Sequence, residues 1–329
     1  MIAKILQGKN LYKAYRRVVS NKGSCGVDRM QVTDLQEYLS THQGDLVREI
    51  LAENYLPEAI RGVEIPKSNG NKRLLGIPTV VDRWLQQAVS QQLMTRFELE
   101  FSDHSYGFRP KKNMQQALIQ SLAYINDGYS DIVDIDLSKF FDEVAHHKIL
   151  QLIYEKVKCK TTLRLIRKWL RAPIRINGKL HKRRKGLPQG SPLSPLLSNI
   201  MLDQLDKYLE KRECRFIRYA DDFSIYTKSK SEAQSIGNEV YVFLRDKLEL
   251  QINREKSGIR RPSNFTVLGH TFTSIYKKGS KGQFQLLVSK RSWAELKRKL
   301  KRVTKKTLGY SFSQRLSAIK LIYQGWINN

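Results

Sequence analysis

Residues 215–227 read RFIRYADDFSIYT, and this stretch decides the fold. Two short runs of aromatic and β-branched residues flank Ala220, Asp221 and Asp222, which predicts two strands joined by a tight turn. The turn would hold two carboxylates side by side. Like charges in a partly dry setting repel each other and raise a pKa unless a cation compensates them. Asp is also common in solvated turns, so this dipeptide alone leaves a divalent-metal site and a plain turn open.

A third carboxylate comes from residues 130–144, SDIVDIDLSKFFDEV. Apolar residues alternate there with Asp134 and Asp136, which predicts a strand that ends near Asp136. Together with Asp221 and Asp222, Asp136 would complete the oxygen ligands that two Mg²⁺ ions need. Two-metal phosphoryl transfer holds such ions about 4 Å apart, one at the attacking hydroxyl and one at the leaving group.

Seven blocks of the sequence, taken together and in order, resemble the reverse transcriptases of group II introns. The resemblance covers nearly the whole chain, and the order of the blocks makes it more specific than any one motif. The blocks are IPKSNGNKRLLGIPTVVDR (65–83), SYGFRP (105–110), DIDLSKFFDEV (134–144), GLPQGSPLSPLLSNIML (186–202), RYADD (218–222), the lysine of NREKS (253–257) and the Leu-Gly of VLGH (267–270).

The resemblance implies an α+β fold of the right-hand polymerase type, with a palm built on an antiparallel sheet and a helical thumb. Relatives usually continue past the Gly-Trp-Ile-Asn run at 325–328, so we expect a short thumb and no endonuclease domain. The predicted segments are fingers with an N-terminal extension (1–103), palm (104–145), fingers (146–188), palm (189–284) and thumb (285–329).

The function implied is RNA-directed DNA polymerisation, in which a primer 3′ hydroxyl attacks the α-phosphate of a dNTP. The expected partners are an RNA template, a DNA or RNA primer and structured intron RNA. Asp136, Asp221 and Asp222 would be the catalytic metal ligands for two Mg²⁺ ions, with Mn²⁺ as a substitute. The alternatives are a non-catalytic maturase, a domesticated enzyme in a role such as phage defence, and an RNA-synthesising polymerase. Adjacent carboxylates at a buried edge are costly without a metal, which argues against the maturase.

A nucleotide pocket is predicted from the 63–77 hairpin, which would turn at Asn69-Gly70 and project Lys67 and Arg73 together. Two cations at a fingertip can clamp a triphosphate, whereas on a random sequence they would more often be a solvated basic hairpin. The family resemblance favours the clamp. It also places the aromatic ring of Phe141 under the sugar of the incoming nucleotide. Two further side chains, Gln189 and Lys256, are expected near the nucleotide.

The charge balance predicts a polyanionic partner. The chain has 329 residues, with 59 Lys and Arg against 31 Asp and Glu, a net charge of +28. A ribosome-bound or membrane-surface protein is the alternative, but no apolar run reaches the roughly 18 residues of a membrane span and the N-terminus lacks a signal-peptide pattern. We therefore expect a cytoplasmic nucleic-acid-binding protein.

Two basic segments are candidate nucleic-acid contacts. Residues 290–306 contain nine basic residues, one acid and a narrow apolar stripe, which predicts a helix that tracks a duplex. Residues 174–185 predict a hairpin turning at Asn177-Gly178 with a basic second arm. Arg109 is predicted either to contact phosphate or to cap a loop. The full set of predicted contacts is Arg109, Lys182, Arg183, Arg184, Lys297, Arg298, Lys301 and Arg302.

Helical periodicity predicts most of the remaining chain. We expect two short helices within 35–51, helices at 81–101 and 113–125 that cover the palm sheet, helix across 146–171 and a helix over 238–250. A strand is expected at 265–272. Cys25, Cys159 and Cys214 are predicted to be buried thiols, and the pair His146 and His147 is predicted to be structural rather than metal-binding.

Overall fold

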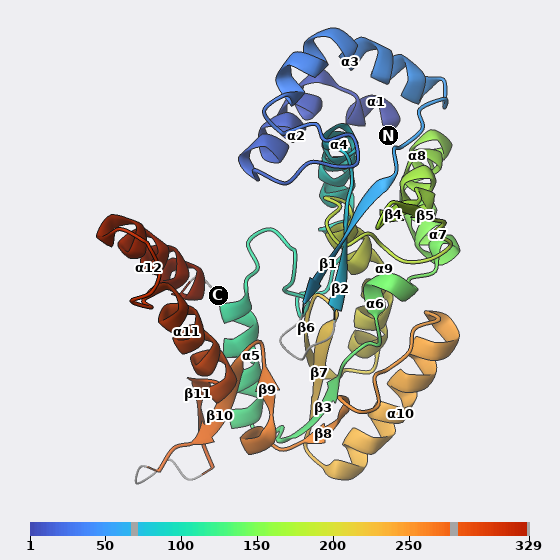
Figure 1. Cartoon of the computed structure of the whole chain (residues 1–329). Helices are drawn as coiled ribbons and strands as arrows, with labels where there is room; N and C mark the ends of the chain where they lie inside the picture. The colour runs from blue at the N-terminus through green and yellow to red at the C-terminus, as the bar shows by residue number, and fades with distance from the viewer. Residues whose placement is uncertain (67–71, 277–281, 328–329) are drawn as a thin grey trace.

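The chain is α+β, as predicted, in the computed structural model, which describes residues 1–66, 72–276 and 282–327. The described part contains three sheets; in Figure 1 the first lies above the second, and the third lies beside the lower part of the second. We call them the N-terminal sheet (β2-β1-β4-β5), the central sheet (β6-β7-β3-β8) and the third sheet (β11-β10-β9).

The central sheet is antiparallel throughout and carries the predicted hairpin. Its strands are β6 (Arg215–Tyr219), β7 (Asp222–Thr227), β3 (Asp131–Ile135) and β8 (Gly258–Arg260). Tyr219 pairs with Asp222, so the turn consists of two residues. Ile135 lies opposite Phe223, and the next position of this register brings Asp136 level with Asp222. The sheet therefore gathers the three predicted carboxylates at one edge.

Strand alternation divides the core between the two faces of the central sheet. Val133 and Ile225 pack with α9 (Ser194–Lys211) and α10 (Lys230–Lys247), whereas Ile132 and Tyr226 pack with α5 (Met114–Asn126). The predicted helix at 113–125 thus covers this sheet. The helix expected at 238–250 begins eight residues earlier, because the Ser229 hydroxyl accepts a hydrogen bond from the Glu232 N–H and caps it.

The other helix expected on the central sheet lies elsewhere. It is α4 (Val80–Phe97), and it packs against α2 (Gly8–Ser20) and α9. The Trp84 indole donates to the Leu11 carbonyl, and the Asn10 amide donates to the Ala88 carbonyl. These buried hydrogen bonds fix α4 beneath the N-terminal helices, so the prediction for 81–101 was wrong in its packing partner.

The N-terminal sheet joins segments that are distant in the sequence. β1 (Ile60–Pro66) pairs antiparallel with β2 (Lys72–Ile77) and parallel with β4 (Ile174–Ile176), which forms the predicted hairpin with β5 (Lys179–His181). The surrounding helices are α1 (Ile2–Ile5), α2, α3 (Leu35–Leu51), α7 (His146–Val157) and α8 (Lys160–Arg171).

A single helix, α3, replaces the two short helices predicted within 35–51. Its buried residues are Leu35, Leu39, Leu46 and Ile50, whose spacing follows one face of one continuous helix. The polar residues between Leu39 and Leu46 turn outwards without breaking the hydrogen-bond ladder.

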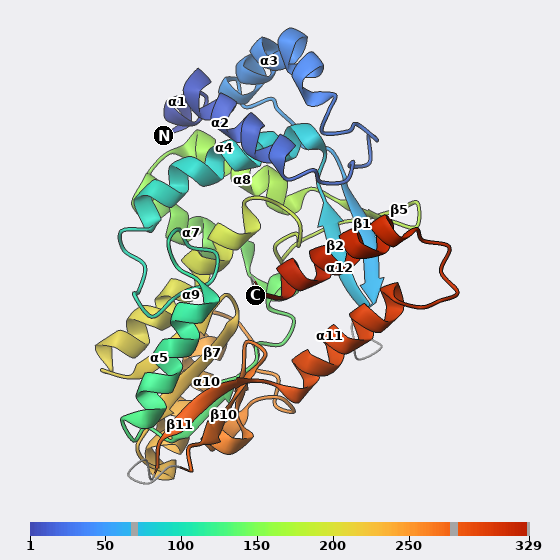
Figure 2. The same cartoon turned by 90° about the vertical axis from the view of Figure 1, so that its left-hand side faces the viewer.

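The third sheet connects the body to a C-terminal helix pair, α11 (Lys290–Val303) and α12 (Phe312–Ile327). Its strands are β9 (Thr266–Val267), β10 (His270–Ser274) and β11 (Phe284–Val288). The strand predicted over 265–272 is split into β9 and β10 because Leu268 and Gly269 both have positive φ angles, +48° and +78°. The helix pair stands away from the body in Figure 1, and in the perpendicular view α12 passes in front of β1 and β2 (Figure 2).

Candidate active site

Three carboxylates lie near one another at the edge of the central sheet. Asp221 lies in the turn, Asp222 opens β7, and Asp136 follows the end of β3. Burial raises the pKa of Asp222 to about 6, and the neighbouring charges of Asp221 and Asp136 add to the shift. Burial also raises the pKa of Asp221, which the positive charge of Arg73 opposes. Asp222 still opens to solvent on one side. The cluster is therefore strained by like charge and suited to a cation.

Two hydrogen bonds hold the backbone of Asp136, one at its N–H and one at its carbonyl. Its N–H donates to the Ser257 hydroxyl at 3.0 Å, and its carbonyl accepts from the Asn253 N–H at 2.8 Å. Lys256, which lies between Asn253 and Ser257 in the sequence, has its Nζ 3.4 Å from Asp136 Oδ2. The loop after α10 thus holds both Asp136 and the positive charge of Lys256 beside it.

Carboxylate oxygens are the ligands that Mg²⁺ prefers, so Asp136, Asp221 and Asp222 fit a magnesium site by donor chemistry. As the side chains stand, no group of three or more His, Cys, Asp or Glu among the described residues is arranged so that it could hold a metal ion. The ion pair with Lys256 keeps Asp136 oriented toward that cation. Lys256 contacts only Oδ2 of Asp136, through an exposed pair, so this contact does not prevent Asp136 from binding a metal.

A pocket of about 640 Å³ lies beside Asp221 and contains three of the predicted nucleotide-binding residues. Arg73 enters it from β2, Phe141 from α6 (Phe140–Glu143) and Gln189 from the loop before α9. The predicted partner of Arg73, Lys67, lies outside the described residues. Lys256 is absent from the lining and contacts Asp136 instead, so the structure sets it next to the carboxylates.

The loop at 186–190 holds this pocket together. The Gly76 N–H donates to the Gln189 carbonyl at 2.9 Å, and the Leu187 N–H donates to the Phe141 carbonyl at 2.5 Å. A Cβ atom on Gly190 would lie 2.7 Å from the Gly76 carbonyl oxygen, at a φ of +130°. Glycine is therefore required where the loop meets β2. The hydrogen bonds fix Gln189 and Phe141 relative to Arg73.

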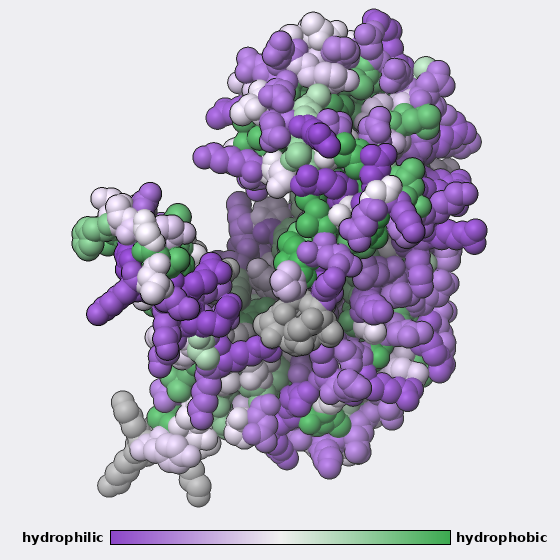
Figure 3. All heavy atoms as spheres, in the orientation of Figure 1, coloured by the Kyte–Doolittle hydropathy of each residue, from purple (hydrophilic) through white to green (hydrophobic). Residues whose placement is uncertain are grey.

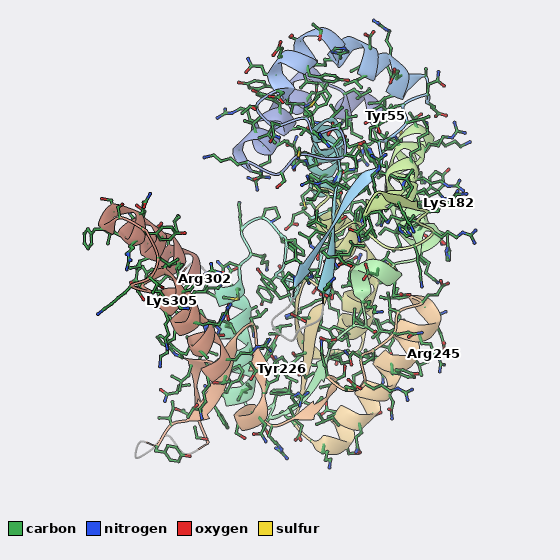
Figure 4. All side chains as sticks on the ribbon, in the orientation of Figure 1. Tyr55, Lys182, Tyr226, Arg245, Arg302 and Lys305 are labelled. Atoms are coloured by element: carbon green, nitrogen blue, oxygen red, sulfur yellow. The ribbon has the colours of Figure 1, made fainter. Side chains whose placement is uncertain are left out.

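The predicted nucleic-acid contacts separate into different surfaces. Lys182 lies on the outer side of the N-terminal sheet, far from Arg302 of α11 and from Lys305, which follows α11 (Figure 4). Lys297, Lys301 and Arg302 are exposed on α11, and Arg298 pairs with Glu295 at 2.8 Å. A wide hollow separates this helix pair from the body, and its helix side is hydrophilic (Figure 3). The structure therefore does not bring the two basic segments onto one face.

Two of the predicted contacts are engaged within the protein. Arg109 is buried, its guanidinium pairs with Glu98 at 3.0 Å, and it donates to the carbonyls of Ser102 and Ser105. These contacts match the capping alternative rather than a phosphate contact. Arg183 donates to the Gly186 carbonyl, and burial lowers its pKa to about 10. Its neighbours Lys182 and Arg184 remain exposed.

A basic groove along α2 was missed by the sequence analysis. Its lining includes Lys9, Tyr12, Lys13 and Arg16, and its volume is about 1160 Å³. Arg17, Gln87, Phe108, Pro192 and Pro195 line both this groove and the smaller pocket, so the two are continuous. The signal was the alternation of basic and aromatic residues in KNLYKAYRR, which helical spacing places on one face.

The remaining side chains singled out in the sequence have structural contacts. His146 is buried, and its Nε2–H donates to the Gly186 carbonyl at 2.9 Å, as a structural histidine should. The three cysteines are free thiols that are half-buried, so the expectation of full burial was wrong. In the part of the chain that the structure describes, no helix is long and apolar enough to cross a membrane.

Comparison with known proteins gives consistent matches. A family model described as "Reverse transcriptase (RNA-dependent DNA polymerase)" matches residues 65–272. Protein YkfC of Escherichia coli (strain K12) is 30% identical over 324 residues, which cover 86% of this chain and 84% of YkfC. The group II intron-encoded protein LtrA of Lactococcus lactis subsp. cremoris is 29% identical over 77% of this chain, but the match spans only 53% of LtrA. The retron Mx162 reverse transcriptase of Myxococcus xanthus is 30% identical over 50% of this chain and 35% of its own length.

Proposed function

Because the chain belongs to the reverse transcriptase family of RNA-dependent DNA polymerases, we propose that it extends a primer 3′ hydroxyl with dNTPs on an RNA template by two-metal phosphoryl transfer. The observation that carries the proposal is the cluster of Asp136, Asp221 and Asp222 beside a pocket that contains Arg73, Phe141 and Gln189. The central sheet is then the palm, the N-terminal sheet with its helices the fingers, and α11 with α12 the thumb. The segment boundaries at 103, 145, 188 and 284 are part of this proposal.

The three carboxylates have the role of metal ligands in this proposal. Mg²⁺ bound there would activate the primer hydroxyl and neutralise charge on the phosphates, and Mn²⁺ would substitute for it. The raised pKa of Asp222 supports this role, because the mutual repulsion of the carboxylates is relieved by a cation. Lys256 serves as the resting partner of Asp136 and moves to the nucleotide phosphates when that carboxylate is engaged.

The pocket residues bind and orient the nucleotide. Arg73 neutralises the negative charge that grows on the leaving pyrophosphate, together with Lys67. Phe141 packs edge-on against Phe140 with ring centroids 5.3 Å apart, and the hydrogen bond to its carbonyl fixes its backbone. A ring held in this way under the sugar leaves no room and no hydrogen-bond partner for a 2′ hydroxyl. Phe141 therefore selects dNTPs over ribonucleotides.

The primer–template lies in the hollow between the thumb and the body. The exposed cations Lys297, Lys301 and Arg302 on α11 contact backbone phosphates, which gives strong binding with little dependence on sequence. Lys182 lies on the opposite side of the molecule (Figure 4) and, with its exposed neighbour Arg184, forms a separate basic surface. The similarity to LtrA makes structured intron RNA a candidate for that surface, and a non-catalytic maturase is the second candidate function.

The carboxylates can be tested by replacing Asp221 or Asp222 with Asn. Each variant should lose primer extension on an RNA template while retaining RNA affinity, because the carboxylates hold metal and do not grip the duplex. Asp246→Asn is a matched control, since Asp246 pairs with Arg245 on the solvent side of α10 (Figure 4). Loss of RNA binding together with activity would indicate a structural role for the turn, and full activity in Asp222→Asn would overturn the proposal. A wild-type protein that binds RNA but extends no primer would favour the maturase.

A further inference from the structure

The turn that carries Asp221 and Asp222 has an unfavourable backbone. Ala220 adopts a φ of +59°, in the left-handed region, where a residue with a Cβ atom is disfavoured by about 1–2 kcal/mol. Such a conformation persists only where the surrounding contacts impose it. The side of the turn away from the pocket supplies these contacts.

Arg218 is the centre of that support. Its side chain is fully buried, and its Nη1 donates to the Ala220 carbonyl at 2.8 Å. The Nε and Nη2 atoms form a bidentate pair with Asp206 of α9, at 2.8 and 2.5 Å, and the Asp206 carboxylate is 1% exposed. Asp206 thus neutralises the charge of Arg218 on the α9 side, and Nη1 of the guanidinium remains to hold the turn.

Asn199 extends the support to a second segment. Its Oδ1 accepts from Arg218 Nη1 at 3.0 Å, and its Nδ2 donates to the Gly107 carbonyl at 2.9 Å. A Cβ atom at Gly107 would lie 2.3 Å from the Ala220 backbone nitrogen, so only glycine allows this approach. The Arg218 N–H also donates to the His104 carbonyl. Residues 104–107 therefore lie directly against the strand and turn.

We propose that Arg218 is a positioning residue for the reaction: through the Ala220 carbonyl it fixes the turn so that Asp221 and Asp222 can take up metal together. The inference rests on the proposed metal-ligand role of these carboxylates. Arg218 contacts neither substrate nor metal. It acts as outer-sphere partners of metal ligands do, by reducing the number of orientations the ligands can adopt.

Arg218→Lys tests this role because lysine keeps the positive charge but cannot form the fork that joins Asp206 to the Ala220 carbonyl. The half-saturating Mg²⁺ concentration for primer extension should rise about tenfold or more, and the rate of first-nucleotide addition should fall by about 10- to 100-fold. The KM for dNTP at saturating Mg²⁺ should stay near the wild-type value. Without nucleic acid, the rise in Tm on adding Mn²⁺ should be smaller than in the wild type.

Tyr55→Phe is a control for lost stability alone. The Tyr55 hydroxyl is buried and donates to Asp82 at 2.8 Å in the N-terminal part of the molecule, away from the turn (Figure 4). This variant should lower Tm without changing the Mg²⁺ requirement or the response to Mn²⁺. Asn199→Ala is a second test, since it leaves the pair of Arg218 with Asp206 intact and removes the link to Gly107. It should shift the Mg²⁺ requirement in the same direction as Arg218→Lys.

The inference is overturned if folded Arg218→Lys retains the Mg²⁺ requirement and Mn²⁺ response of the wild type and loses only Tm, as Tyr55→Phe does. Should Arg218→Lys not fold, a wild-type Mg²⁺ requirement in Asn199→Ala overturns it equally. The variant Asp222→Asn distinguishes a failure of the positioning role from a failure of the proposed metal-ligand role. If that variant is inactive while the variants at Arg218 and Asn199 bind metal normally, the metal-ligand role stands and only the positioning role fails.

Discussion

Replacing Lys297, Arg298, Lys301 and Arg302 together with Gln should reduce the salt dependence of primer–template binding. Arg298 is already paired with Glu295 at 2.8 Å, so three of the four cations are expected to neutralise phosphates. Each neutralised phosphate contributes roughly 0.7–0.9 to the slope of log affinity against log salt. The slope should therefore become about 2–3 units shallower. Between 50 and 200 mM salt, the wild type should lose roughly 20- to 50-fold more affinity than the variant.

The assay measures Kd for one RNA template with a DNA primer at several salt concentrations, then product lengths under single-encounter conditions. Products of the quadruple variant should be shorter, while first-nucleotide addition at saturating primer–template stays within about twofold of the wild type. Exchanging Lys182 and Arg184 for Gln is the matched control, because both are exposed and Lys182 lies on the opposite side of the molecule from α11 (Figure 4). A quadruple variant that loses first-nucleotide addition but keeps the wild-type slope would refute the assignment of α11 as the duplex grip.

Two other predictions concern single side chains. Phe141→Ala should admit ribonucleotides, since removing the ring relieves an overlap of about 1–3 kcal/mol, or roughly 5- to 150-fold in discrimination; an unchanged ratio of kcat/KM for dNTP and rNTP would direct attention to Phe140. Burial lowers the pKa of His146 below 6.5, so the unfolded chain takes up this proton at a higher pH than the native protein. The contribution of neutral His146 to the free energy of unfolding is therefore fully present above about pH 6.5. It declines as the pH falls from there through the native pKa. His146→Gln should weaken that decline in a Tm series from pH 7.5 to 5, whereas an unaltered pH profile would assign the loss to other groups.

The edge of the central sheet that carries the three carboxylates could be predicted from the sequence, because it depends on short-range rules. Alternation of apolar residues predicts β3, β6 and β7, and a two-residue turn aligns Asp222 with its neighbours. Once β3 pairs with β7, the register brings Asp136 level with Asp222. The 186–190 loop was recognised by its glycines and prolines, and the backbone hydrogen bonds account for its closeness to Arg73.

The burial of individual arginines could not be predicted from the sequence. Arg109, Arg183 and Arg218 lie in strongly basic or motif-rich stretches where exposure is the usual expectation. Their partners Glu98, the Gly186 carbonyl and Asp206 come from other segments, so only the tertiary fold shows which guanidinium groups are satisfied internally. The groove along α2 could not be predicted for the same reason. Helical periodicity shows which residues of α2 share a face, but not whether another segment of the chain covers that face.

The parallel pairing of β1 with β4 has a consequence for how the chain folds. Ile60 pairs with Ile174, so this contact joins residues 114 positions apart, and the chain between them contains β3, the strand that precedes Asp136. Such a long-range pairing is slow to form, and on a ribosome it cannot begin until β4 has been synthesised. A fragment that ends at residue 103 would expose the free edge of β1 and should aggregate. The segment from residue 1 to β2 is thus not an independent folding unit, because its sheet needs β4.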